Sequence, residues 1–166
     1  MGGNETFCAT VCISGDPLIQ AARTCMTDRV LVDTNILVYA YDADAGEKRS
    51  KARDVIDSLW NDGTGAVATQ VLAEFFVTIT RKVKHPLSVS SAKQIIEDYQ
   101  AVWEVYPTTG SLVVKAISGV ESYRLSFWDA MIWASAVINR VPTIYSEDMQ
   151  DGQTIEEVLI KNPLAM

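Results

Sequence analysis

Short apolar segments alternate with amphipathic segments along most of this chain, and this alternation limits the folds open to it. Residues 29–32, RVLV, are the first apolar segment and predict a buried strand. The same reasoning predicts further strands at 66–69, 104–106, 143–145 and 155–160, the last at an edge. Helical spacing of apolar residues predicts helices at 47–61, 70–84, 91–102, 112–122 and 127–140. Strands that alternate with helices favour one α/β domain with a mainly parallel central sheet.

Size and charge narrow the class of protein. The chain has 166 residues, of which 48% are hydrophobic, and this is enough for one domain with a real core. Its formal net charge of −7 argues against a general nucleic-acid coat, because such a protein needs a basic surface to release counterions. No apolar run approaches the roughly 18 residues of a membrane span, so no membrane association is expected.

The first 25 residues differ from the rest of the chain. All three cysteines, Cys8, Cys12 and Cys25, precede Met26. No second Cys or His pair lies near them in the sequence, so a zinc site is not expected. The cysteine-free remainder fits a reducing, cytoplasmic setting. Residues 1–25 lack periodicity and the features of a signal peptide. We expect them to be an extension, either disordered or an artefact of start-site choice, before one domain at 26–166. The alternative is a short arm that packs on that domain.

Four acidic residues fall at one edge of the predicted sheet. Asp33 directly follows the first strand, and Asp148 follows the strand at 143–145. Glu74 lies in the second turn of the helix after the second strand, and Asp129 lies in the first turn of the most apolar helix. Ligands of parallel sheets bind at the carboxyl edge of the strands, where these acids are expected. Spacing alone leaves open whether they converge on one point.

Each of these acids also has a purely structural explanation. Asp33 is a good N-cap residue, and Ser126 with Asp129 has the S-x-x-D spacing of a capping box. Glu74 is expected on the helix face opposite to the apolar stripe, where it would be solvated. Asp148 fits an ordinary turn. Asp129 is the hardest to explain in this way, because a charge at the end of a buried helix needs a partner.

Together the four acidic stretches resemble the motifs of PIN-domain ribonucleases, most closely the VapC-type toxins of bacterial toxin–antitoxin systems. The stretches are VDTNILVY, the Glu74 of TQVLAEFF, LSFWDAMIWASA and YSEDMQDG. They occur in the family's order, Asp-Glu-Asp-Asp, and the resemblance covers residues 29–163. It implies a PIN-like three-layer α/β/α fold with a mainly parallel central sheet.

The resemblance also implies a function and the residues that perform it. The function is that of a metal-dependent endoribonuclease, in which a metal-activated water cleaves an RNA phosphodiester bond and leaves 5′-phosphate and 3′-hydroxyl ends. The residues that would be catalytic and hold Mg²⁺ or Mn²⁺ are Asp33, Glu74, Asp129 and Asp148. Asn35 and Ser146 would contact and orient these ligands without binding the metal themselves. The expected partners are RNA, a cognate antitoxin and a second copy of the chain.

The chemistry of the acids agrees with this implication. Neighbouring carboxylates repel one another, and hard divalent cations, which prefer oxygen ligands, relieve that repulsion. A metal also lowers the pKa of water, so no histidine is required. The one histidine, His85, precedes Pro86 and predicts a solvated loop.

Other residues offer weaker indications. Arg81, in the basic stretch TRKVKH, shares the helix face of Glu74 and is a candidate RNA contact, although a solvated helix end also favours positive charge. The tryptophans fall among apolar periodic positions, which predicts core packing rather than base stacking. They are Trp60, Trp103, Trp128 and Trp133.

Two other functions remain open from the sequence. A catalytically silent PIN-like module would bind nucleic acid or protein without cleaving it, and only metal-dependent RNA cleavage separates it from a nuclease. A phosphotransferase of the haloacid-dehalogenase type also places an Asp after its first strand. That class needs a second Asp two residues on, where this chain has Asn35.

Overall fold

Six short strands make one central sheet in the computed structural model, which describes residues 28–165. In spatial order the strands are β3 (Glu104–Tyr106), β2 (Gly65–Ala68), β1 (Val30–Val32), β4 (Thr143–Tyr145), β6 (Val158–Lys161) and β5 (Thr154–Ile155). Every neighbouring pair is parallel except β5 and β6. The mainly parallel sheet is therefore confirmed, whereas the extension expected at residues 1–25 lies outside the described residues.

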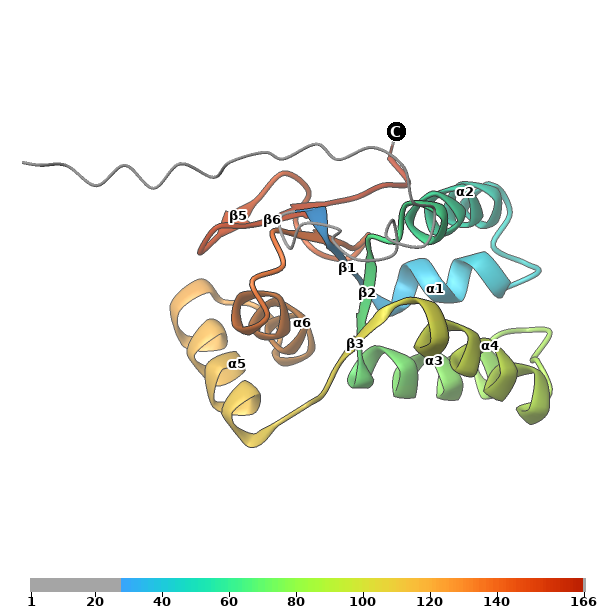
Figure 1. Ribbon diagram of the computed structural model, residues 1–166, viewed down its shortest axis with the longest axis horizontal. Coiled ribbons are helices and arrows are strands. Elements are labelled where there is room, and N and C mark those ends of the chain that lie inside the picture. Colours follow the sequence, from blue (N-terminus) through green and yellow to red (C-terminus); the bar gives the residue numbers. More distant parts are fainter. Residues whose placement is uncertain (1–27, 166) are drawn as a thin grey trace, which may run out of the picture.

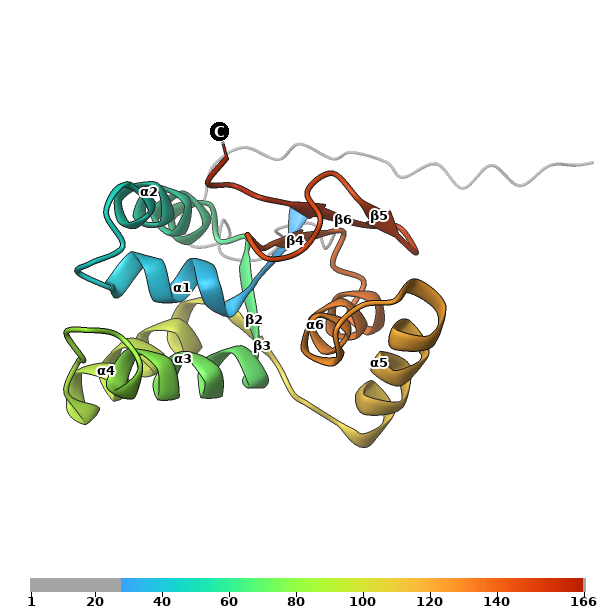
Figure 2. The same ribbon diagram turned by 180° about the vertical axis from the view of Figure 1, so that it is seen from behind.

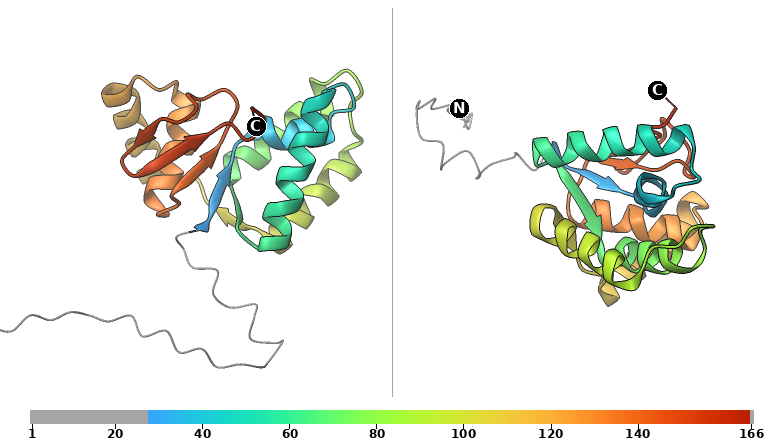
Figure 3. Two further views of the ribbon diagram at one scale, coloured as in Figure 1. Left: turned by 90° about the horizontal axis from the view of Figure 1, so that it is seen from above. Right: turned by 90° about the vertical axis from the view of Figure 1, so that its right-hand side faces the viewer.

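Helices cover both faces of the sheet because the direction in which successive strands are added across the sheet reverses once. It runs from β1 to β2 to β3 through α1 (Thr34–Tyr41), α2 (Glu47–Asp62), α3 (Thr69–Arg81) and α4 (Val89–Val102). It then returns past β1 to β4 through α5 (Gly110–Tyr123) and α6 (Phe127–Ile138). Parallel crossovers are right-handed, so the return places α5 and α6 on the opposite face. Figures 1 and 3 show these two groups on either side of the sheet, which confirms the three-layer arrangement.

The change of direction creates a switch point between β1 and β4. These strands are paired in parallel, with Val32 opposite Tyr145 at their carboxyl ends. The segments that leave the two strands diverge to opposite faces, and such a point is where ligands bind in open α/β sheets. Asp33 and Ser146 are the next residues after the two strands, so they meet there.

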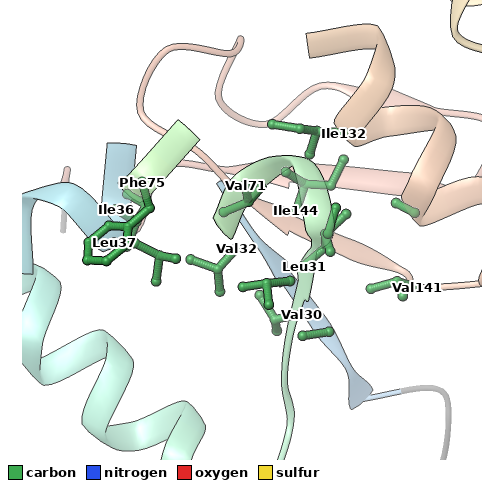
Figure 4. Close-up of a cluster of buried hydrophobic side chains, with 14 of the residues drawn as sticks. Val30, Leu31, Val32, Ile36, Leu37, Val71, Phe75, Ile132, Val141 and Ile144 are labelled. Carbon is green, nitrogen blue, oxygen red and sulfur yellow. The ribbon is translucent and has the colours of Figure 1, made fainter. Parts of the chain in front are cut away.

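The strands around this point are buried on both faces. Leu31, Val32 and Ile144 are inaccessible to solvent. Figure 4 shows Val71 and Phe75 of α3 and Ile132 of α6 among the apolar side chains that surround them. Helices on both faces explain why these strands are continuous apolar runs instead of alternating ones.

The predicted helices are all present, and the largest difference at an end is at α3. This helix was predicted over 70–84 and ends at Arg81, because the next residue, Lys82, already serves as its C-cap. Among the described residues, no helix is long and apolar enough to cross a membrane.

The single edge strand predicted at 155–160 is wrong. These residues form a hairpin of β5 and β6, and β6 lies inside the sheet. Glu156 and Glu157 at the turn have φ of 46° and 67°, the left-handed conformation of a tight two-residue turn. Neither is Gly or Asn, so the usual hairpin signal is missing. The Glu156 carboxylate accepts hydrogen bonds from Lys115 Nζ (2.9 Å) and the Tyr123 hydroxyl (2.9 Å), which holds the turn against α5.

Close packing of α5 on α6 depends on a glycine. Gly119 of α5 is buried against Trp133 of α6, and a Cβ added at Gly119 would lie 2.7 Å from Trp133 Cζ3. The Trp133 indole is inaccessible to solvent and donates a hydrogen bond to the Ile155 carbonyl (3.3 Å). The indole therefore has little freedom to move away.

We expect Gly119→Ala to lower the free energy of unfolding by about 1–3 kcal/mol, the usual effect of overpacking. This loss opposes the better helix propensity of Ala. Gly110→Ala is the matched control, because Gly110 starts the same helix and its added Cβ would meet no atom within 4 Å. Urea unfolding of the two variants and the parent checks this, and equal midpoints for both variants would contradict the packing described.

Candidate functional site

The carboxylate of Asp33 is held at the carboxyl end of β1. Asp33 is buried, with 6% of its surface exposed. Its Oδ1 accepts the Thr34 N–H (2.6 Å), which makes Asp33 the N-cap of α1. Its Oδ2 accepts the Ser146 hydroxyl (2.6 Å) and the Asn35 side-chain amide (3.1 Å). The structural explanation of Asp33 as a cap is therefore correct but incomplete, since a second oxygen is fixed by two more side chains.

Ser146 joins the ends of β1 and β4. It is inaccessible to solvent and directly follows β4. While its hydroxyl donates to Asp33, its oxygen accepts the backbone N–H groups of Asp148 (3.2 Å) and Met149 (3.3 Å). The Asn35 amide also donates to it (3.3 Å). Asn35 and Ser146 thus both contact Asp33, which is where the predicted supporting role requires them.

Glu74 is tied to the same region by α3. It is half-buried, and its Oε2 accepts the Thr34 hydroxyl (2.9 Å) while its Oε1 accepts the Gln70 amide (2.9 Å). The alternative of a freely solvated Glu74 is therefore wrong. The roles of Thr34 and Gln70 were not predicted from the sequence. For Gln70 the i, i+4 spacing to Glu74 was an available signal, because such residues are neighbours on a helix.

All four predicted acids line one pocket of about 760 Å³. Asp129 enters from the first turn of α6 and Asp148 from the loop after β4. Within residues 28–165, neither of these two carboxylates accepts a hydrogen bond. Ser126 caps α6 by accepting the Asp129 N–H (3.2 Å), so the Asp129 carboxylate is not needed as a cap.

The acids surround the pocket without meeting at one point. Among residues 28–165, no three acidic, histidine or cysteine side chains lie close enough together to ligate one ion. Figure 2 shows why the acids approach from several directions: α1 and α3 lie side by side, and α6 lies across β1 and β2 from them.

The electrostatics of the pocket are those of crowded negative charge. The pKa of Asp33 is raised to about 6, with burial as the largest cause. The hydrogen bonds from Ser146 and Thr34 act in the opposite direction, and the charges of Asp129 and Asp148 add to the rise. Asp129 and Asp148 are therefore close enough to repel Asp33. Carboxylate oxygens that repel one another are a donor set that suits a hard divalent cation such as Mg²⁺.

One basic residue lines the described part of the pocket, while Arg81 as an RNA contact stays a prediction. Lys82, the C-cap of α3, lines the pocket, whereas the exposed Arg81 does not. One position along a helix is a rotation of about 100°, which separates the two side chains. His85 lies in an exposed loop, as predicted, with its Nδ1 2.6 Å from an Asp44 carboxylate oxygen.

Three of the four tryptophans pack in the core as predicted, and the fourth does not. Trp103 and Trp133 are buried, and Trp60 packs against the core. Trp128 is 59% exposed and lines the pocket beside Asp129. The prediction fails there because apolar periodicity does not show which end of α6 the rest of the domain covers.

Comparisons with known proteins agree with the fold. The family model of the PIN domain matches residues 30–150. A search of curated proteins finds no match. A solved structure described as a toxin–antitoxin complex from Klebsiella pneumoniae is similar, with a TM-score of 0.59 and 18% identity, over 81% of this chain and 97% of the other.

Two further solved structures share the fold. The first is the sarcin-ricin loop cleaving toxin VapC20 from Mycobacterium tuberculosis, with a TM-score of 0.58 and 20% identity over 72% of this chain and 89% of the other. The second is VapBC2 from Rickettsia felis, bound to a DNA fragment from its promoter. It has a TM-score of 0.57 and 16% identity over 80% of this chain and 97% of the other. At these identities the likeness concerns the fold.

We expect the metal-free protein to lose stability through Asp33 as pH rises. The pKa of Asp33 is about 6 in the folded protein, against 3.8 in an ordinary setting, so the folded state binds the proton more tightly. Protonated Asp33 therefore adds to the free energy of unfolding. This contribution is about 3 kcal/mol, is fully present below pH 4 and is lost as pH rises through 6. Urea unfolding in EDTA from pH 4 to pH 7 checks this, with Asp33→Asn as reference. A constant difference between the two proteins across that range would contradict it.

We expect Asp129→Asn to separate metal binding from capping. It removes one of the charges that repel Asp33, so metal-free stability should be unchanged or rise by up to about 1 kcal/mol. Mg²⁺ should raise the melting temperature of the parent, following RT ln(1 + [L]/Kd), and that of the variant much less. The control is Asp54→Asn, on the exposed surface of α2. Equal Mg²⁺ shifts in the parent and Asp129→Asn would remove Asp129 from the metal site.

Proposed function

This chain belongs to the PIN domain family, and from this we propose that it is a metal-dependent endoribonuclease and the toxin of a toxin–antitoxin pair. The observation that carries the proposal is the placement of Asp33, Glu74, Asp129 and Asp148 around one pocket at the switch point of the sheet. The similar fold of VapC20, which is described as cleaving the sarcin-ricin loop, supports RNA as the substrate.

We propose that these four carboxylates would hold one or two divalent cations, Mg²⁺ or Mn²⁺, with no more than two of them on any one ion in the arrangement described and water completing the coordination. A cation bound there supplies positive charge to the phosphate and makes water a stronger nucleophile at neutral pH. The raised pKa of Asp33 and the unpaired carboxylates of Asp129 and Asp148 support this assignment, because each marks a place where positive charge is stabilised.

The other residues of the pocket would hold these groups in place. Ser146 and Asn35 fix the direction of the Asp33 carboxylate, and Thr34 fixes that of Glu74. Lys82 is suited to pair with a phosphate of the RNA backbone, since it is the basic side chain among the described residues that line the pocket. Carboxylates are then the groups available to accept the proton of the attacking water.

Incubation of the protein with total RNA and Mg²⁺, followed by mapping of new 5′ ends, tests the proposal. We expect new ends that carry a 5′-phosphate. Asp33→Asn and Asp129→Asn should each lower the rate of cleavage by more than about 100-fold. Loss of a residue that only supports a metal ligand already costs about 10- to 100-fold, and these carboxylates would be ligands themselves. Asp54→Asn should cleave as the parent does.

One alternative function survives and one does not. RNA binding without cleavage, in Mg²⁺ and in Mn²⁺, would favour the catalytically silent PIN-like module. The haloacid-dehalogenase alternative is excluded by the family to which the chain belongs. Asn35, in the position that such enzymes need for a second Asp, instead donates a hydrogen bond to Asp33.

We also propose the partners that the family resemblance implies. An antitoxin would place an Arg or Lys against Asp33 and Asp129, because charge-assisted bonds to a crowded carboxylate site are strong. The similar fold of the Klebsiella pneumoniae structure, which is described as a toxin–antitoxin complex, supports such a partner. We also propose a homodimer, because the family resemblance implies one. RNA as substrate would place the protein in the cytoplasm.

A further inference from the structure

Trp128 is an aromatic side chain that packing does not explain. It lies directly before Asp129 in the first turn of α6, and 59% of its surface is exposed. Phe127 packs against it edge to face, with ring centroids 5.3 Å apart and planes at 67°. This contact limits the rotation of the indole but leaves most of it uncovered. An exposed indole forgoes the large hydrophobic gain that burial of an aromatic ring brings.

The pocket beside this indole is lined by apolar side chains as well as acidic ones. Val38, Val77 and Ile132 line it together with Trp128. A ligand suited to both kinds of lining carries a phosphate, or another group that acidic residues bind through a cation, next to a flat apolar group. A nucleotide has this composition, with its base one sugar away from its phosphate.

Charge on the protein cannot supply most of the affinity for such a ligand. The chain carries a net charge of −7, and among the described residues Lys82 is the one basic side chain that lines the pocket. Counterion release at a single lysine contributes little. Stacking of a base on an aromatic ring does not depend on net charge and contributes about 1–3 kcal/mol per base.

We propose that Trp128 is the platform on which an unpaired nucleobase of the RNA stacks, beside the phosphodiester held at the acidic residues. This inference rests on the proposed function and assigns a base-binding residue to it. A base within a duplex has both faces covered by its neighbours, so only an unpaired base can lie on the indole.

Binding of a short fluorescein-labelled single-stranded RNA, measured by anisotropy in Mg²⁺, tests the inference. The full chain carrying Asp148→Asn serves as the background, so that the probe is not cut. We expect Trp128→Ala to weaken binding about 5- to 100-fold. Trp128→Phe should keep most of the affinity. The matched control is Ile138→Ala, which removes an exposed apolar side chain at the far end of the same helix and should leave binding unchanged.

Two further measurements separate stacking from a structural effect. The RNA should quench the tryptophan fluorescence of the background protein, and Trp128→Phe should abolish this quenching although it still binds. Lys82→Ala should reduce the salt dependence of log Kd by about 0.7, the value for one single-strand phosphate contact, whereas Trp128→Ala should leave it unchanged. A duplex of the same sequence should bind no better to the background protein than to Trp128→Ala.

The outcomes distinguish this inference from the proposed function. If the parent cleaves RNA and Trp128→Ala raises KM with little change in kcat, both stand. If the parent cleaves RNA and Trp128→Ala binds and cleaves as well as Ile138→Ala, the stacking platform is overturned, and the exposed indole is left for a protein partner. If the parent does not cleave RNA but Trp128-dependent binding and quenching are seen, the nuclease proposal fails while the stacking site stands.

Discussion

The buried carboxylate of Asp33 is the constraint on which the site depends. A carboxylate with 6% of its surface exposed is unfavourable unless several donors compensate for its lost hydration, and here the backbone of Thr34, the hydroxyl of Ser146 and the amide of Asn35 all donate to it. Ser146 follows β4 and Asn35 lies in α1, so the bonds to this one carboxylate fix both the start of α1 and the loop after β4. The compensation is partial, since the pKa of Asp33 remains at about 6.

The fold makes such a site tolerable because three helices begin there. Asp33 caps α1, Asp129 lies in the first turn of α6, and Glu74 lies in the second turn of α3. The N-terminus of each helix carries partial positive charge, which stabilises a carboxylate at the cap or in the first turn by a fraction of a kcal/mol to about 1 kcal/mol and weakens beyond it. For Asp33 the capping role and the functional role are therefore not alternatives. The Thr34 N–H group that Asp33 caps also stabilises its negative charge in the pocket.

The sequence predicted the placement of the four acids at one edge of the sheet better than it predicted the side chains around them. Asp33, Asn35 and Ser146 are close together because β1 and β4 are paired, and the alternation of strands and helices already pointed to that carboxyl edge. Local periodicity could not tell Lys82 from Arg81, since the end of α3 decides which of them reaches the pocket. Nor could it tell the exposed Trp128 from the buried Trp133, because both belong to a helix that is apolar on nearly every side.

By itself the sequence determined the order and type of the main elements, because apolar spacing and turn residues act over a few neighbouring positions. It also determined which acids follow strands, and through them the family that it resembles. Only the tertiary structure decided that residues 154–161 form a hairpin with β6 inside the sheet, since the left-handed turn at Glu156 is held by contacts with α5. Only the tertiary structure decided that Thr34 orients Glu74 and that the indole of Trp128 faces the pocket. Those facts depend on which helix ends meet at the switch point, and contacts between residues 40 or more positions apart are not encoded in local spacing.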